Sequence, residues 1–172
     1  MRVFLPANRE INRMIFDPLA EEMIDNIMGV MQDAFDPAFG EAWTRPQLRG
    51  SLMLDNCHCG ILDEAGQPPR RGSGAAGFCL SRNAYDEEEL LLLAVRPAAR
   101  RRGIATKLLE DLAGGALERG VRRIFLEMRE GNPAEMLYTA WGFSAVGRRP
   151  NYYRGENGQR IDAITFEKIL QG

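Results

Sequence analysis

Residues 96–103 form an arginine-rich turn whose composition suits the binding of an anion. The turn holds four arginines, Arg96, Arg100, Arg101 and Arg102, and ends at Gly103, directly before an amphipathic helical pattern. The first amides of a helix lack intrahelical partners and carry partial positive charge. Gly103 has no side chain to keep a ligand away from them, and Ala105 is small. The turn therefore predicts a polyphosphate site, although four arginines in an exposed turn are usually only solvated.

Cys57, His58 and Cys59 are the other residues whose types could bind a ligand, in this case a metal ion. On a strand, Cys57 and Cys59 point to one face and His58 to the other. No second pair of ligands at zinc-site spacing accompanies them. The sequence therefore predicts no metal site. Because three cysteines cannot form a full disulfide framework, it also predicts a protein of the reducing cytoplasm.

Length and composition predict one globular domain over residues 1–172. Hydrophobic residues make up 45% and charged residues 27% of the 172, and the formal net charge is −2. That charge argues against a nonspecific nucleic-acid partner, whose binding domain would be basic. The longest apolar run, Leu90–Val95, is too short to cross a membrane, and the N-terminus lacks the features of a signal peptide.

Hydrophobic periodicity predicts a mixed sheet with helices on its faces, an α/β protein. Helices are expected from Asp17 to about Phe35, after Thr44-Arg45-Pro46, from Gly103 to Gly120, and over Pro133–Trp141. Their inward positions are expected to include Leu48, Leu52 and Met53, and then Ile104, Leu108, Leu109, Leu112, Ala116 and Leu117. Strands are expected at Cys57–Leu62, Ala75–Leu80, Leu90–Val95, Val121–Met128, Ser144–Tyr153 and Arg160–Lys168, with a hairpin turn over Gly155–Gly158 and a surface loop over Glu64–Gly74.

Several segments resemble a known enzyme family in the order that the family requires. The strand Leu90–Val95, the turn Arg100–Ala105 and the helix containing Leu108-Leu109 resemble motif A of the GCN5-related N-acetyltransferase (GNAT) superfamily. Further matches are Leu126–Asn132, Leu137-Tyr138 and Gly142-Phe143. The segment Gly147–Tyr153 with Asp162–Ile164 is similar to the C-terminal end of the bacterial ribosomal-protein-alanine N-acetyltransferases. The resemblance covers roughly Glu88 to Ile164.

The resemblance implies a particular sheet. A GNAT fold has a mixed, mostly antiparallel sheet in which a central pair of parallel strands splays apart, with helices on both sides. Here the pair corresponds to Leu90–Val95 and Val121–Met128. The cofactor-binding core then spans about 88–143, and a C-terminal hairpin spans about 144–168.

The cosubstrate implied by the resemblance is acetyl-CoA. Backbone amides of Arg101 to Thr106 are expected to hold its pyrophosphate, and the edge of Leu93–Val95 is expected to pair with pantetheine like an added strand. Asn132 is expected to bind pantetheine, although the stretch from Asn132 to Tyr138 is one residue shorter than is usual in the family. The expected cofactor-binding residues are Leu93, Ala94, Val95, Arg100, Arg101, Arg102, Gly103, Ile104, Ala105, Thr106 and Asn132.

The implied reaction is acetyl transfer to the α-amine of a protein N-terminus, with a ribosomal protein as the example. Glu127 is expected to act as general base and Tyr138 as the acid that protonates the leaving sulfur. An α-amine, with a pKa of about 8 against about 10.4 for lysine, needs little help to lose its proton. Trp43, Tyr152 and Tyr153 are expected to border the acceptor.

The residues themselves leave other interpretations open. Glu127 could be a strand-end charge paired with Arg129, while Tyr138, Trp43 and the two C-terminal tyrosines could be packing residues. Two other functions fit the same motifs: acetylation of a small-molecule amine, and acetyl-CoA binding without catalysis.

Overall fold

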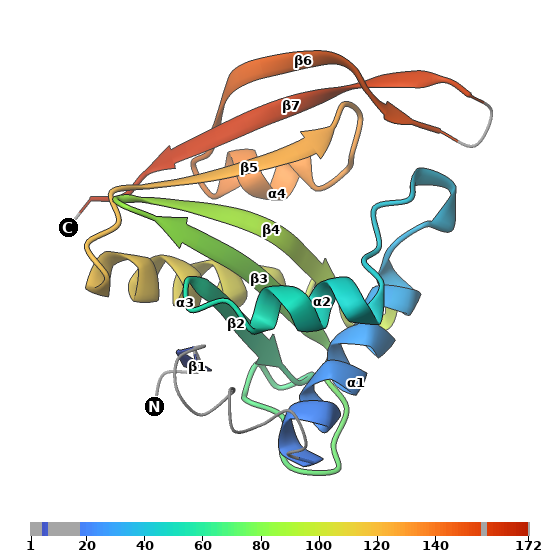
Figure 1. Ribbon diagram of the computed structural model, residues 1–172, viewed down its shortest axis with the longest axis vertical. Helices are drawn as coiled ribbons and strands as arrows, with labels where there is room; N and C mark the ends of the chain where they lie inside the picture. Colours follow the sequence, from blue (N-terminus) through green and yellow to red (C-terminus); the bar gives the residue numbers. More distant parts are fainter. Residues whose placement is uncertain (1–4, 7–17, 156–157, 172) are drawn as a thin grey trace.

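The computed structural model describes residues 5–6, 18–155 and 158–171, which build one seven-stranded sheet with helices on both faces (Figure 1). The strand order is β1-β2-β3-β4-β5-β7-β6. The helices are α1 (Pro18–Ala34), η2 (Pro37–Phe39), α2 (Arg45–Leu52), η3 (Pro97–Ala99), α3 (Ile104–Glu118) and α4 (Glu135–Ala140). The strands are β1 (Leu5–Pro6), β2 (Cys57–Leu62), β3 (Gly77–Ala84), β4 (Glu87–Val95), β5 (Arg123–Arg129), β6 (Ser144–Arg154) and β7 (Arg160–Ile169).

The central pair of strands confirms the expected sheet. Every adjacent pair in the described sheet is antiparallel except β4 and β5, which run parallel. Their pairing covers only Glu87–Leu90 against Arg123–Leu126. Beyond those residues β4 continues along β3 as far as Val95, and β5 continues along β7 as far as Arg129. The two strands therefore separate toward their carboxyl ends, as Figure 1 shows.

A β-bulge in β4 marks the point of separation. Leu80 of β3 pairs with Leu92 and Ser81 pairs with Leu90, so Leu91 is an extra residue without a partner on β3. The bulge also changes which face the following side chains occupy: Leu90 packs in the α3 core, and Leu92 packs in the α1–α2 core. Because a bulge increases local twist, it turns the end of β4 away from the direction of β5.

Two hydrophobic cores lie on the two faces of the sheet. The first packs α3 and α4 against residues such as Ile124, Leu126 and Met128 of β5. The second packs α1 and α2 against β2, β3 and the end of β4. Since side chains alternate along a strand, Phe125, Glu127 and Arg129 face the α1–α2 side.

The structure corrects the expected strand boundaries. β4 begins at Glu87 rather than Leu90, and β3 runs on to Ala84. The glutamates belong to the strand because Glu88, fully buried, accepts a hydrogen bond of 2.6 Å from Ser81 Oγ and pairs with the Arg119 guanidinium. The acidic residues therefore made the start of this central strand difficult to predict from the sequence.

Two expected inward positions are wrong. Met53 is 46% exposed because it follows the last residue of α2, and Leu117 is 37% exposed at the last turn of α3. The expected helix start at Asp17 and the central residues of the Gly155–Gly158 turn, 156 and 157, lie outside the described residues.

We predict that Arg119→Met lowers the free energy of unfolding by about 3 kcal/mol, because it leaves the buried Glu88 carboxylate without its cation. The matched control is Arg122→Met, which removes an exposed arginine nearby and is expected to cost less than about 0.5 kcal/mol. Urea denaturation measures both. Equal stabilities of the two variants would contradict the structural role of this ion pair.

Candidate active site at the diverging strands

A gap opens between the ends of β4 and β5, bordered by Leu91–Val95 on one side and Glu127–Arg129 on the other. On the side of β4 that faces this gap, the backbone of Leu93 and Ala94 has no strand partner among the described residues. The carbonyl of Val95 accepts a hydrogen bond of 3.2 Å from Arg100 Nε. An unpaired strand edge of this kind offers alternating donors and acceptors to an extended ligand.

The start of α3 presents free backbone donors beside the same gap. The helix is capped by Gly103 at a φ of +79°, and Arg101 has a φ of +62°. No described residue accepts a hydrogen bond from the amides of residues 101–106, and the helical ladder begins where Lys107 N donates to Gly103 O. Apart from its own neighbours along the chain, no described residue has an atom within 4 Å of the position that a Cβ would take at Gly103. This arrangement suits an anion such as a diphosphate.

The arginine side chains of the turn mainly hold the turn in place. Arg96 donates to the carbonyl of Ala75 over 2.7 Å and pairs with Asp33 of α1. Arg100 donates to the carbonyl of Ala34 over 3.2 Å, and Arg102 pairs with Glu64 at 2.9 Å. The amide of Arg100 is also engaged, since it donates to Pro97 O over 3.3 Å. The free amides therefore belong to residues 101–106.

Glu127 and Tyr138 lie on opposite faces of the sheet, Glu127 on β5 facing the α1–α2 side and Tyr138 on α4 in the α3 core. Glu127 is half-buried, and its carboxylate lies 3.4 Å from the Arg149 guanidinium. Tyr138 is buried in the α3 core, with its ring edge-on to Phe143 at 5.6 Å between centroids. Burial raises the pKa of Tyr138, so the phenol keeps its proton at neutral pH.

The charged residues beside Glu127 form separate pairs. Arg129, the other partner that the sequence allowed for Glu127, lies 3.2 Å from Glu41 and 3.6 Å above the ring of Phe39. Burial raises the pKa of the Glu41 carboxyl, and the charge of Arg129 opposes that effect. These contacts join the end of β5 to the segment between α1 and α2.

A cavity of about 610 Å³ adjoins Glu127 on the α1–α2 side. We term it the acceptor cavity, after the role that we propose for it. Its lining residues are Asn56, Arg82, Ala84, Glu87, Glu89, Phe125, Leu126, Glu127, Arg149, Tyr152 and Thr165. Of the residues expected to border an acceptor, Tyr152 lines it. The ring of Tyr153 stands edge-on to Tyr152 at 5.1 Å, and burial together with the charge of Glu127 raises its pKa to about 12.

Trp43 does not line the acceptor cavity. It is half-buried against the α1–α2 core, and its backbone amide donates to Met31 Sδ over 3.0 Å. Asn132 uses its side-chain oxygen to accept a hydrogen bond of 2.9 Å from the amide of Ala134, ahead of α4. Both residues therefore have local structural partners, and their expected roles toward ligands stay predictions.

An irregularity in β6 determines the positions of Tyr152 and Tyr153. Arg149 pairs with Ala163 and Tyr153 pairs with Ile161, so three residues of β6 oppose Asp162 alone. Asp162 accepts hydrogen bonds from the Asn151 amide over 2.8 Å and from Arg148 Nε over 2.6 Å. These contacts lower the pKa of Asp162, so they persist at neutral pH and are lost only well into acid. Alternating sequence patterns gave no sign of this bulge.

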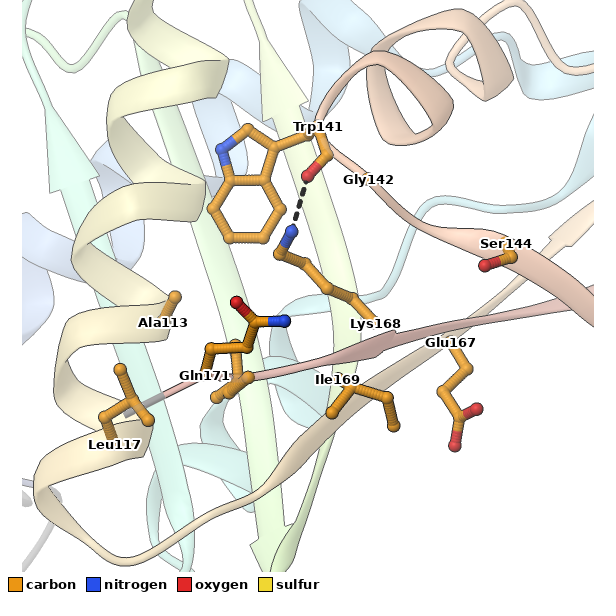
Figure 2. Close-up of a pocket in the computed structure, with 10 residues that line it drawn as sticks. Ala113, Leu117, Trp141, Gly142, Ser144, Glu167, Lys168, Ile169 and Gln171 are labelled. Atoms are coloured by element: carbon orange, nitrogen blue, oxygen red, sulfur yellow. Dashed lines mark hydrogen bonds between the residues drawn. The ribbon is translucent and has the colours of Figure 1, made fainter.

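A second cavity, of about 560 Å³, lies between α3, α4 and the end of β7 (Figure 2). Lys168 donates to the carbonyl of Trp141 over 2.7 Å there, and its ammonium lies 4.5 Å from the centroid of the indole ring. None of the predicted site residues lines this cavity.

The described residues contain no cluster of three or more potential metal ligands. Cys57 and Cys59 pack in the α1–α2 core, and His58 Nε2 lies 2.8 Å from Asn83 Oδ1. No described helix has the length and apolar character needed to cross a membrane.

The sequence is similar to those of several known proteins. The sequence model of the acetyltransferase (GNAT) family matches residues 27–143. The ribosomal protein bS18-alanine N-acetyltransferase of Haemophilus influenzae is 36% identical over 94 residues, which are 55% of this chain and 64% of that relative. The corresponding protein of Escherichia coli strain K12 is 39% identical over 90 residues, 52% of this chain and 60% of that relative. The chain therefore matches less than two thirds of the length of either relative.

Solved structures are also similar over most of the chain, among them an enzyme of the same name as these relatives. The crystal structure of the ribosomal-protein-S18-alanine N-acetyltransferase from Escherichia coli has a TM-score of 0.71 at 28% identity. The superposition covers 87% of this chain and 90% of that one.

We predict that Gly103→Leu weakens the binding of acetyl-CoA at least tenfold, because the side chain would stand among the free amides of residues 101–106. The control is Gly120→Leu, at a φ of +82° and also without neighbours within 4 Å, which imposes similar backbone strain at the other end of α3. Calorimetric titration with acetyl-CoA measures the affinity of both variants. Unchanged affinity in the Gly103 variant would contradict this site.

We predict that Asp162→Ala raises the KM for an acceptor peptide about tenfold and leaves the KM for acetyl-CoA unchanged. The substitution removes the acceptor that fixes the β6 bulge beneath Tyr152 and Tyr153. Asp86→Ala, an exposed change in the turn between β3 and β4, serves as the control. A parallel rise in both KM values would mean that Asp162 supports the fold in general.

Proposed function

The chain belongs to the acetyltransferase (GNAT) family, and from that premise we propose that it transfers the acetyl group of acetyl-CoA to the α-amine of a protein N-terminus. The observation that carries the proposal is the gap between β4 and β5, with a carboxylate on one face of the sheet and a buried phenol on the other. The names of the similar relatives support a ribosomal protein as the acceptor, and on that basis we propose a cytoplasmic reaction.

In this proposal the free amides of residues 101–106 bind the diphosphate of acetyl-CoA, and the unpaired edge of Leu93–Val95 binds the pantetheine arm. The arginines of the turn contribute by holding it against α1. Acetyl-CoA supplies an acyl group activated as a thioester. The chain's task is to bring that thioester through the gap and to hold an amine against it, because orientation supplies much of the rate.

The chemical step forms one bond and breaks another. The amine nitrogen attacks the thioester carbonyl, and the C–N bond forms as the C–S bond breaks. Glu127, directly or through water, takes the proton that the nitrogen loses. Tyr138 gives its proton to the departing sulfur, and its raised pKa means that the proton is present at neutral pH. Each transfer typically contributes about 100- to 10,000-fold.

The form of the acceptor cavity supports a peptide over a small amine. A small apolar amine would be held in a closed and largely apolar pocket. This cavity is lined by charged and polar side chains, and it is bordered by β6, whose exposed Tyr152 could contact a chain that extends away from the site.

We predict that Glu127→Gln and Tyr138→Phe each lower kcat on a peptide with a free α-amine by about 100-fold, with little change in affinity for acetyl-CoA. Release of free thiol reports turnover, and calorimetry reports cofactor affinity. Glu110→Gln, an exposed change on α3, provides the control of equal charge.

Three outcomes would contradict the proposal in different ways. Turnover of small amines with none of any peptide would favour a small-molecule acetyltransferase. Tight binding of acetyl-CoA without turnover of any amine would favour a binding module. Full activity of both variants would remove Glu127 and Tyr138 from the mechanism.

A further inference from the structure

The acceptor cavity extends along the sheet beyond Glu127, and we propose that it binds the residues that follow the acceptor amine in an extended peptide, with a basic side chain at about the fifth residue. The inference rests on the proposed function, because it concerns the peptide whose amine reaches Glu127. It extends that function from the reacting amine to the length and sequence of the acceptor.

The strand register gives the cavity its direction and length. Glu127 and Arg149 line one end. At the other end lie Ala84 and Glu87, which pair with each other, and Glu87 is level with Arg123 of β5. Arg123 precedes Glu127 by four residues, which is about 13 Å along a strand. A peptide that extends along the cavity with its first residue at Glu127 therefore has about its fifth residue near Glu87.

No described helix packs over this part of the sheet. The α1–α2 core takes its strand residues from β2, β3 and the second half of β4, and no described residue of β5, β6 or β7 belongs to it. Figure 1 shows α1 and α2 on the β2–β3 side of the sheet, with β5, β7 and β6 farther from them. The side chains of Glu87 and Glu89 are accordingly 43% and 48% exposed. The far end of the cavity is therefore accessible to a chain that reaches it from solvent.

Between its two ends the cavity offers an apolar contact. Phe125 lines the cavity and lies between Arg123 and Glu127 on the same face of β5, because side chains alternate along a strand. Its ring is partly buried, and the Arg123 guanidinium lies 5.3 Å from the ring centroid. A peptide that extends from Glu127 toward Glu87 thus passes an aromatic ring at about its third residue.

The far end of the cavity carries the less neutralised negative charge. The charged lining residues are three carboxylates and two arginines: Glu87, Glu89, Glu127, Arg82 and Arg149. Arg82 lies 2.7 Å from Glu89, and the Arg149 guanidinium lies 3.4 Å from the carboxylate at the other end. Glu87 instead pairs with Arg123, which also lies 3.6 Å from Glu167 of β7. Because Glu87 shares its cation with a second carboxylate, a basic side chain of the peptide is favoured beside it.

The test varies the length of the acceptor and blocks the far end of the cavity. Alanine-based peptides of two, four and eight residues, each with a free α-amine and an amidated C-terminus, are assayed with acetyl-CoA. Ala84→Trp places an indole at the far end, on an exposed strand position that suits an aromatic residue. Ala145→Trp, at an exposed position of β6 that does not line the cavity, is the matched control.

We expect kcat/KM of wild type to rise about tenfold from the two-residue to the eight-residue peptide, which corresponds to one or two hydrogen bonds. Ala84→Trp is expected to remove that rise and to act on the longer peptides alone, because two residues are too short to reach the indole. Ala145→Trp is expected to keep the rise. Equal kcat/KM for all lengths in wild type, or an Ala84→Trp variant that keeps the rise or slows every peptide alike, would overturn the proposal.

Glu87→Gln tests the chemistry of the fifth residue. An eight-residue peptide with arginine at that position is compared with the alanine peptide, and Glu110→Gln on α3 is the control of equal charge. We expect arginine to raise kcat/KM about threefold in wild type and in the control, a modest gain because the Glu87 carboxylate is half-exposed. In Glu87→Gln the gain is expected to disappear. A wild-type enzyme that gains nothing from arginine would overturn the assignment of a basic residue.

The outcomes separate this proposal from the proposed function. Turnover of peptides of every length at one kcat/KM leaves the peptide N-terminus as acceptor and overturns the role of the cavity. Turnover of small amines with none of any peptide overturns both. A rise with peptide length that Ala84→Trp removes and Ala145→Trp keeps supports both.

Discussion

The site depends on the short length over which β4 and β5 are paired. Four residues of each strand form the parallel ladder, and each strand then follows its other neighbour. Pairing along their whole length would consume the backbone edge of Leu93–Val95 and would close the sheet between Glu127 and Tyr138. Because the ladder stops at Leu90 and Leu126, the backbone edges of the two strands stay unpaired with each other beyond those residues. The bulge at Leu91 gives the separation a local cause.

The general architecture could be predicted because it is encoded in local patterns. The apolar runs of β2, β4 and β5 and the helical stripe of α3 are visible without any partner, and the resemblance to the GNAT superfamily supplied their arrangement. The expected start of β4 was wrong because it depends on contacts with other elements. Glu87–Glu89 has the composition of a loop, and a buried Glu88 is acceptable only because Ser81 on the paired strand donates to it and Arg119, 31 residues further on, pairs with it.

The site too has parts that local sequence predicts and parts that depend on contacts between elements. The free amides at the start of α3 could be predicted from Gly103 and the helical pattern after it, but the roles of the arginine side chains could not. The acceptors of Arg96 and Arg100, the carbonyls of Ala75 and Ala34, are brought near only by the packing of α1 and the loop before β3. Likewise, the sequence offered Arg129 as a partner for Glu127, but the arginine beside Glu127 comes from β6. Ion pairs between elements require the tertiary structure.

The irregular β6 has a consequence for the behaviour of the molecule among its own copies. This strand lies at one edge of the sheet, where exposed N–H and C=O groups could pair with a strand of another molecule and begin a fibril. The bulge over residues 150–152 breaks the straight line of those groups, Pro150 removes one donor, and Arg148 and Arg149 place positive charge beside it. The distortion that places Tyr152 at the cavity beside Glu127 thus also opposes self-association along the open edge of the sheet.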